Sequence, residues 1–220
     1  IIAENAEIQQ VGTGYAFTEG PAVSPDGRIF FTDQPNDRIY VWDETEGIEL
    51  WSEDTGRANG MYFNASGQLV ACADLHNQIV FFDCDKNRHV LFENYENKHL
   101  NGPNDLWIAP NGDIYFTDPY YHRNYWKEGH TEVQDVRGVY HLSVDGSISR
   151  VIDDFKQPNG IIGTADGKTL YVADIGDRKI WKYEIQPDGS LTGKTLFAPE
   201  GSDGMTIDDR GNVYLTMGKV

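Results

Sequence analysis

The chain has 220 residues, of which 39% are hydrophobic and 24% charged, and this composition is typical of a folded globular protein rather than a disordered one. Its formal net charge of −17 would repel phosphate backbones and anionic lipid headgroups, which argues against nucleic acid and membrane as partners. We expect a soluble chain with one domain over residues 1–220, in the cytoplasm, in the periplasm or secreted, and we make no prediction of the compartment or the oligomeric state.

One pattern recurs five times along the chain. An acid or amide residue is followed eight residues later by a glycine in a short polar turn, and the turn separates two apolar runs. Such runs around a glycine turn predict β-hairpins. The five repeats start at Glu19, Asn59, Asn104, Asn159 and Asp203, and their turn glycines are Gly27, Gly67, Gly112, Gly167 and Gly211. Strands are predicted after the turns, over 29–31, 69–71, 114–116, 170–172 and 213–215, with further strands over 38–42, 78–82 and 179–183.

The spacing of the repeats predicts the architecture. Their starts are separated by 40, 45, 55 and 44 residues, close to the roughly 40–50 residues of one four-stranded propeller blade. No segment has a convincing helical period, and strands at such even spacing argue against an α/β fold. We therefore predict an all-β fold, a β-propeller with about five blades in this chain. Ala6 to Val11 is interpreted as an additional strand that helps to close the ring, and no disulfide is expected between Cys72 and Cys84.

The repeat starts predict a metal site. In a propeller the innermost strand of each blade lines the central channel, so equivalent residues at the starts of these strands converge near the axis. Two carboxylates and three amides, without His or Cys, suit a hard cation and favour Ca²⁺ over Mg²⁺. Any one of these residues alone is better explained as a turn former, but five in one register favour the metal site.

Four of the repeat starts lie in strings that resemble the motifs of a known family. The strings are Thr18-Glu19-Gly20-Pro21, Gly102-Pro103-Asn104-Asp105-Leu106, Gln157-Pro158-Asn159-Gly160 and Ser202-Asp203-Gly204-Met205. They are similar to those of the senescence-marker-protein/gluconolactonase/luciferin-regenerating-enzyme-like family, which also resembles diisopropylfluorophosphatase. The resemblance covers nearly the whole chain, and four motifs in order make it specific.

The resemblance implies a six-bladed propeller, whose C-terminal blade would be truncated here, with a catalytic divalent cation in the channel. The implied metal ligands are Glu19, Asn104, Asn159 and Asp203. Ca²⁺ is the expected ion, with Zn²⁺ or Mg²⁺ as alternatives, and Asn59 is kept as a substrate-pocket residue. Senescence-marker-type members carry an arginine that holds the sugar where this chain has Gly102, which leaves the substrate open.

The predicted activity is hydrolysis of a small sugar lactone such as gluconolactone. A channel-bound cation can polarise the lactone carbonyl, and Asp203 is the expected general base or nucleophile. Asp118 opens the long insertion that accounts for the 55-residue spacing, and long loops in compact domains are often functional. Asp118, Tyr120, Tyr121 and His122 are therefore assigned to the substrate pocket, although Asp118 alone reads as a turn residue and an aromatic loop also suits a partner protein.

Two other functions fit the same residues. A phosphotriesterase-like hydrolase would use the cation to polarise P=O instead of C=O. A non-catalytic propeller would bind calcium or a partner protein and hydrolyse neither kind of substrate.

Overall fold

The computed structural model describes residues 7–126 and 130–216. Four antiparallel sheets of four strands each form blades, and the strands of every blade follow one another in chain order. Blade 1 holds β1 (Thr18–Val23), β2 (Ile29–Asp33), β3 (Arg38–Asp43) and β4 (Gly47–Glu53). Blade 2 holds β5 (Ala58–Phe63), β6 (Leu69–Ala73), β7 (Gln78–Phe82) and β8 (Arg88–Phe92).

Blade 3 holds β11 (Leu106–Ile108), β12 (Ile114–Asp118), β13 (Gly138–Leu142) and β14 (Ile148–Ile152). Blade 4 holds β15 (Pro158–Gly163), β16 (Thr169–Asp174), β17 (Lys179–Ile185) and β18 (Leu191–Ala198). Blade 5 is represented by the hairpin of β19 (Met205–Ile207) and β20 (Val213–Leu215). A 3-10 turn, η1 (Gln34–Asn36), and a small ribbon of β9 (Asn94–Tyr95) and β10 (Lys98–His99) complete the elements.

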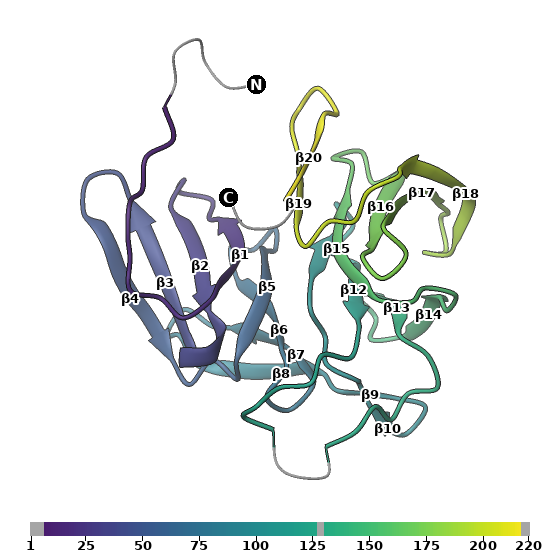
Figure 1. The fold of residues 1–220 in the computed structure, drawn as a ribbon, viewed down its shortest axis with the longest axis horizontal. Coiled ribbons are helices and arrows are strands. Elements are labelled where there is room, and N and C mark those ends of the chain that lie inside the picture. Colours follow the sequence, from purple (N-terminus) through teal and green to yellow (C-terminus); the bar gives the residue numbers. More distant parts are fainter. Residues whose placement is uncertain (1–6, 127–129, 217–220) are drawn as a thin grey trace.

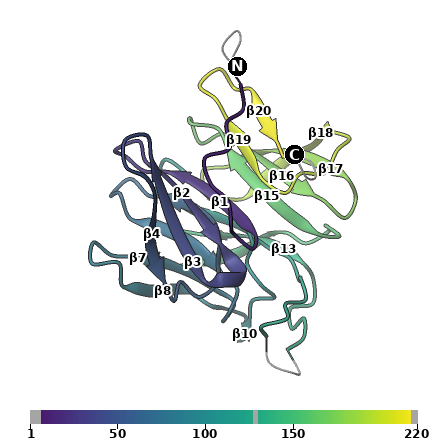
Figure 2. The same cartoon turned by 60° about the vertical axis from the view of Figure 1, so that its left-hand side comes forward.

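The blades follow one another in an arc, from blade 1 to the β19–β20 hairpin (Figure 1). The innermost strands β1, β5, β11, β15 and β19 contact one another in that order, and the view in Figure 2 shows the same succession of sheets. The all-β propeller fold and the hairpins around the turn glycines are thereby confirmed. None of the described residues belongs to a helix with the length and apolar character needed to span a bilayer.

The hydrophobic cores lie between neighbouring blades. One cluster joins blades 1 and 2 and includes Phe30 and Met61, and a second joins blades 2 and 3 and includes Ile79 and Phe116. The third cluster joins blades 3 and 4, and residues of the β19–β20 hairpin pack against it. Because strands alternate their side chains between the two faces of a sheet, each blade contributes apolar residues to both of its neighbours.

The innermost strands are interrupted where the repeats start. Pairing shifts register between Ala58 and Met61 in blade 2 and between Pro158 and Ile161 in blade 4, with a similar shift in blade 1. A bulge leaves residues without ladder partners and re-aims their side chains. The unpaired residues include Asn59 and Asn159, so the bulges turn the repeat starts away from their own sheets.

The prediction of an N-terminal strand is wrong, whereas the expectation for the two cysteines agrees with the structure. Residues 7–11 form no strand, so the strand expected over Ala6 to Val11 is wrong for its described part, and Ala6 lies outside the described residues. A strand forms only where a neighbouring strand satisfies its backbone, and this exposed segment pairs with no strand in the described part of the chain. Cys72 and Cys84 are both free, as expected.

Replacing Gly60 by alanine should destabilise the fold. A Cβ at this position would lie 2.6 Å from the Asn104 carbonyl oxygen and 2.6 Å from the Asp105 Cα, and backbone atoms of a neighbouring blade cannot rotate away. We expect the free energy of unfolding to fall by about 1–3 kcal/mol in urea titrations. Gly204→Ala, at the equivalent position of the β19 repeat, is the control, because its Cβ would meet only Thr216 Oγ1 at 3.6 Å among the described residues. Equal stability of the two variants would contradict this account.

Candidate active site at the hub

Hydrogen bonds connect each blade to the next at the repeat starts. Thr32 Oγ1 donates to the Asn59 carbonyl at 3.3 Å, and Gly60 N donates to the Asn104 carbonyl at 2.8 Å. The link from blade 3 to blade 4 runs from Ile161 N to Asp105 Oδ2 at 3.2 Å. From blade 4 to blade 5 the link is made by side chains of two repeat starts, which are described next. The repeats thus meet at the hub as the sequence predicted.

Asn159 and Asp203 are in direct contact. Asn159 Nδ2 donates to Asp203 Oδ1 at 2.8 Å and to the Tyr121 hydroxyl oxygen at 2.8 Å. Asn159 is 2% exposed, and its Oδ1 is buried without a hydrogen-bond partner among the described residues. Both amide hydrogens are therefore used, while the carbonyl oxygen of the same amide lacks the partner that a buried polar atom normally has.

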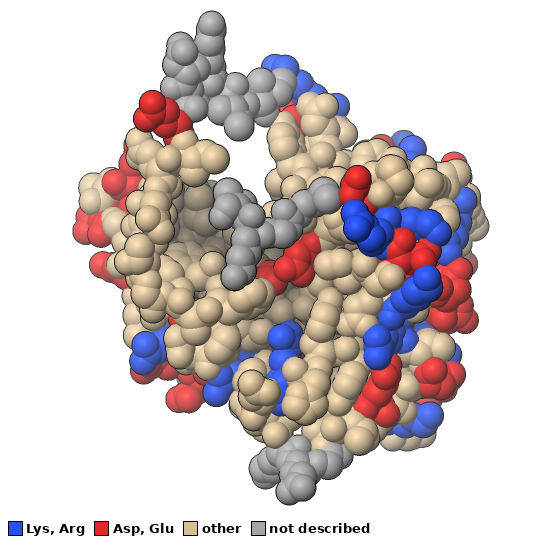
Figure 3. Space-filling model, viewed as in Figure 1, with Lys and Arg blue, Asp and Glu red and all other residues tan. Residues whose placement is uncertain are grey.

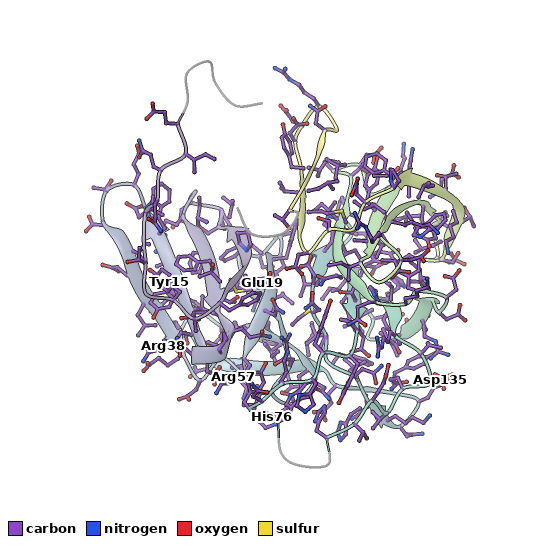
Figure 4. All side chains as sticks on the ribbon, viewed as in Figure 1. Tyr15, Glu19, Arg38, Arg57, His76 and Asp135 are labelled. Carbon is purple, nitrogen blue, oxygen red and sulfur yellow. The ribbon has the colours of Figure 1, made fainter. Side chains whose placement is uncertain are left out.

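Carboxyl groups are concentrated at the hub. Burial, followed by the nearby Asp203 and Asp105 carboxylates, raises the pKa of Glu19 to about 8. Burial raises the pKa of Asp105 to about 7, with a smaller contribution from Asp203. Glu19 lies on the inner edge of blade 1 (Figure 4), and Figure 3 shows acidic side chains at the hollow in the middle of this face with basic ones close by. A cation at the hub would relieve this repulsion.

The two remaining repeat starts are buried beside this group. Asn104 is 6% exposed and Asn59 is 2% exposed. The Asn104 N–H donates to the Thr117 carbonyl at 2.9 Å, which fixes its backbone at the start of blade 3. Among the described residues, no hydrogen bond joins the Asn104 or Asn59 side chain to Asp203, so their roles as ligand and pocket residue stay predictions.

The donor set fits a hard cation. The described residues hold no cluster of three or more His, Cys, Asp or Glu side chains arranged around a metal, so an ion here depends on amide oxygens. Asn159 Oδ1 is such an oxygen, buried and unpaired, and it lies on the amide that contacts Asp203. Carboxylate and amide oxygens are the ligands of Ca²⁺ rather than of soft metals, so the residues present suit the predicted group.

The insertion after Asp118 reaches the hub through Tyr121. The Tyr121 hydroxyl accepts the hydrogen bond from Asn159, whereas the Tyr120 hydroxyl donates to the His130 carbonyl at 3.4 Å and His122 is exposed. Asp118 is fully buried, and its two carboxylate oxygens accept the N–H groups of Asn101 and Gly102 at 2.9 and 2.8 Å. Asp118 thus holds the segment that leads into Asn104, and its contact with a substrate stays a prediction.

Three residues near the hub were not singled out by the sequence analysis. Asp105 occupies the position at which the four other repeats have a glycine after their first residue, and this departure is a signal that the sequence contains. Asp74 and Arg123 form an ion pair between blade 2 and the insertion, with Nε and Oδ2 separated by 2.8 Å. Their partnership joins residues 49 apart in sequence, and only the path of the loop brings them together.

Gly102 has a specific packing role. Its φ is +150°, and a Cβ there would lie 3.3 Å from the ring of Trp126. The indole of Trp126 also donates to the Asp74 carbonyl oxygen at 2.7 Å. The place where senescence-marker-type relatives are expected to carry an arginine is therefore covered by an aromatic side chain of the insertion.

The fold and the hub motifs agree with comparisons to known proteins. The chain belongs to the SMP-30/gluconolactonase/LRE-like family, whose model matches residues 17–220. A gluconolactonase of Zymomonas mobilis is 27% identical, over 97% of this chain and 68% of that protein. The pentonolactonase XacC of Haloferax volcanii is 22% identical, over 93% of this chain and 67% of that protein.

Solved structures show the same architecture. A gluconolactonase from Xanthomonas campestris superimposes with a TM-score of 0.88 at 29% identity, over 94% of this chain and 72% of that chain. Regucalcin of Agrobacterium tumefaciens, described as a calcium-binding protein, superimposes with a TM-score of 0.72 at 17% identity, over 92% of this chain and 68% of that chain. At that identity the second likeness supports the fold alone.

Asp118→Asn tests whether this carboxylate is structural. The amide would turn an N–H donor toward one of the two backbone N–H groups, so one hydrogen bond is lost and two donors face each other. We expect a loss of about 1–3 kcal/mol in the free energy of unfolding, measured by urea titration. Asp153→Asn, at an exposed position, should leave stability unchanged. A raised KM with unchanged stability would instead assign Asp118 to the substrate pocket.

Proposed function

We propose that this chain hydrolyses a sugar lactone such as gluconolactone, with a divalent cation at the hub and with Asp203 as the general base or nucleophile. The observation that carries the proposal is the contact between Asn159 and Asp203, together with the buried, unpaired oxygen of the same Asn159 amide. Two repeat starts from different blades thereby combine a carboxylate and an amide oxygen at one point.

The class of the enzyme follows from the family and from named relatives. A gluconolactonase and a pentonolactonase each match more than nine tenths of this chain, and with such relatives the chain is a lactone-hydrolysing enzyme, a carboxylic ester hydrolase. Which sugar lactone it hydrolyses belongs to the proposal, because one relative is named for gluconolactone and the other for a pentonolactone.

The proposed cation ligands are Glu19, Asn104, Asn159 and Asp203. Ca²⁺ is the first choice, since an all-oxygen set with neutral amides suits this ion, and a calcium-binding protein shares the fold. Zn²⁺ and Mg²⁺ are the alternatives. When bound, the cation supplies Lewis-acid polarisation of the lactone carbonyl.

Asp203 is suited to move the proton. Its Oδ1 accepts the Asn159 hydrogen bond, which leaves Oδ2 to act on water. As the general base, Oδ2 takes a proton from a water whose oxygen attacks the carbonyl carbon, the ring C–O bond breaks, and the proton passes to the departing alkoxide, so that lactone and water give the hydroxy acid. As the nucleophile, the same oxygen would attack the carbonyl carbon, and the ring C–O bond would break, its oxygen taking a proton from solvent. Water would then cleave the resulting acyl–Asp203 anhydride to give the hydroxy acid and the free carboxylate.

Asp203→Asn should abolish hydrolysis and keep the fold. The amide is nearly isosteric but cannot accept the proton, so kcat should fall by a factor of about 10³, measured on glucono-1,5-lactone with circular dichroism to check folding. Asp209→Asn, the same change at an exposed position on the adjoining hairpin, is the control and should keep full activity. Undiminished turnover by a folded Asp203→Asn enzyme would refute the mechanism.

Calcium should stabilise the protein. Ligand binding at 100 times its Kd adds about 2.7 kcal/mol to the free energy of unfolding, which for a chain of this size raises Tm by roughly 5–10 °C. Glu19→Gln should bind calcium more weakly and show a smaller shift at the same concentration, whereas Glu49→Gln, at an exposed position of β4, should match the unmodified protein. Absence of a shift with Ca²⁺, Zn²⁺ and Mg²⁺ would contradict the site, and a shift without hydrolysis of any ester or lactone would favour a non-catalytic propeller.

A further inference from the structure

The insertion between β12 and β13 is fixed to the blades on both of its sides. Toward blade 2, the side chains of Arg123 and Tyr125 and the indole of Trp126 all bond to Asp74. Toward blade 4, Tyr121 is bonded to Asn159. A loop that is tied to two blades at once forms a fixed wall of the hub rather than a free arm.

Asp74 is the anchor of this wall. Its carboxylate is 2% exposed and accepts three side-chain hydrogen bonds, from Gln34 Nε2 at 3.0 Å, Arg123 Nε at 2.8 Å and Tyr125 Oη at 2.6 Å. Arg57 adds a second positive charge, with its guanidinium carbon 4.5 Å from the centre of the Tyr125 ring. A buried carboxylate with this many donors orients the groups around it, because each donor would be costly to leave unpaired.

Arg123 has donors that this anchor does not use. Only its Nε is hydrogen-bonded to the described residues, so the two terminal nitrogens keep their N–H groups for another acceptor. Its side chain is 21% exposed, so it is accessible from solvent. The guanidinium therefore offers a fork of free donors held in one orientation.

The fork lies close to the hub. The guanidinium carbon is 5.4 Å from the centre of the Tyr121 ring, and the Tyr121 hydroxyl contacts Asn159. The free donors of Arg123 therefore lie beside the proposed active site.

We propose that Arg123 is the specificity-determining residue of this enzyme, which binds two adjacent hydroxyl oxygens of a sugar lactone through its terminal nitrogens while Asp74 positions it. The planar fork of arginine matches two neighbouring acceptors. A site built to bond substrate hydroxyls discriminates against analogues that lack them, because a bound analogue covers these donors without giving them an acceptor. This inference rests on the proposed lactonase function.

The test compares two lactones that share a six-membered ring. Glucono-1,5-lactone carries hydroxyl groups, and δ-valerolactone does not. In Arg123→Gln, kcat/KM for the sugar lactone should fall about 100-fold, mainly through KM, while that for δ-valerolactone should fall less than about threefold. Equal losses on both lactones would reduce Arg123 to a structural partner of Asp74, and no loss on either would remove it from the site.

Two further variants separate specificity from folding. Arg38→Gln breaks an arginine–carboxylate pair with Glu53 on blade 1, away from the hub (Figure 4), and should leave both lactones unaffected. Should Arg123→Gln fail to fold, Arg123→Lys keeps a positive charge beside Asp74 without the fork, and the same preferential loss on the sugar lactone is expected.

A binding measurement keeps the inference separate from the proposed activity. Glucono-1,5-lactam has the hydroxyl groups of the sugar lactone and resists hydrolysis. In calorimetric titrations the unmodified protein should bind it at least about tenfold more tightly than Arg123→Gln does. Lack of lactone hydrolysis by the unmodified protein would overturn the proposed function, while equal affinity for the lactam, or no binding by either protein, would overturn the role of Arg123.

Discussion

The close approach of neighbouring blades at the hub is the constraint on which the rest of the structure depends. The inner strands β1, β5 and β15 break their ladders at bulges, and released backbone bonds to the next blade, as Gly60 N does to Asn104 O. This contact is closed to any residue with a Cβ, which explains the glycine that follows most repeat starts. The polar residue before that glycine is consequently directed to the axis.

The same constraint gathers the charges of the site. Carboxylates from three blades are held close enough that Asp203 and Asp105 both raise the pKa of Glu19. Such repulsion lowers stability unless a cation offsets it, and the buried Asn159 oxygen lacks a partner at the same place. Architecture and proposed chemistry therefore have one origin. The geometry that closes the blades against one another also gathers these carboxyl groups and leaves the Asn159 amide oxygen without a hydrogen-bond donor among the described residues.

Local patterns were sufficient for the fold and for part of the site. The turn glycines and the alternating runs around them predict the hairpins, because a hairpin is determined within about a dozen residues, and equal positions in equal blades bring Asn159 and Asp203 together. The structural role of the buried Asp118 was harder to predict from the sequence, since its carboxylate oxygens accept hydrogen bonds from backbone N–H groups 16 and 17 residues earlier. The pairing of Asp74 with Arg123 depends on the route of a loop with no repeat, and no pattern in the sequence specifies that route.

The ion pair between Asp74 and Arg123 constrains how these two positions can change during evolution. Loss of Arg123 leaves the 2% exposed Asp74 carboxylate without its charged partner, and a buried charge without a partner is strongly destabilising, whereas Arg123 itself is 21% exposed. The two positions lie in different repeats, so duplication of a blade could not have supplied both at once. Across related chains we expect them to be gained and lost together, with neutral replacements of Asp74 preceding any change of the arginine.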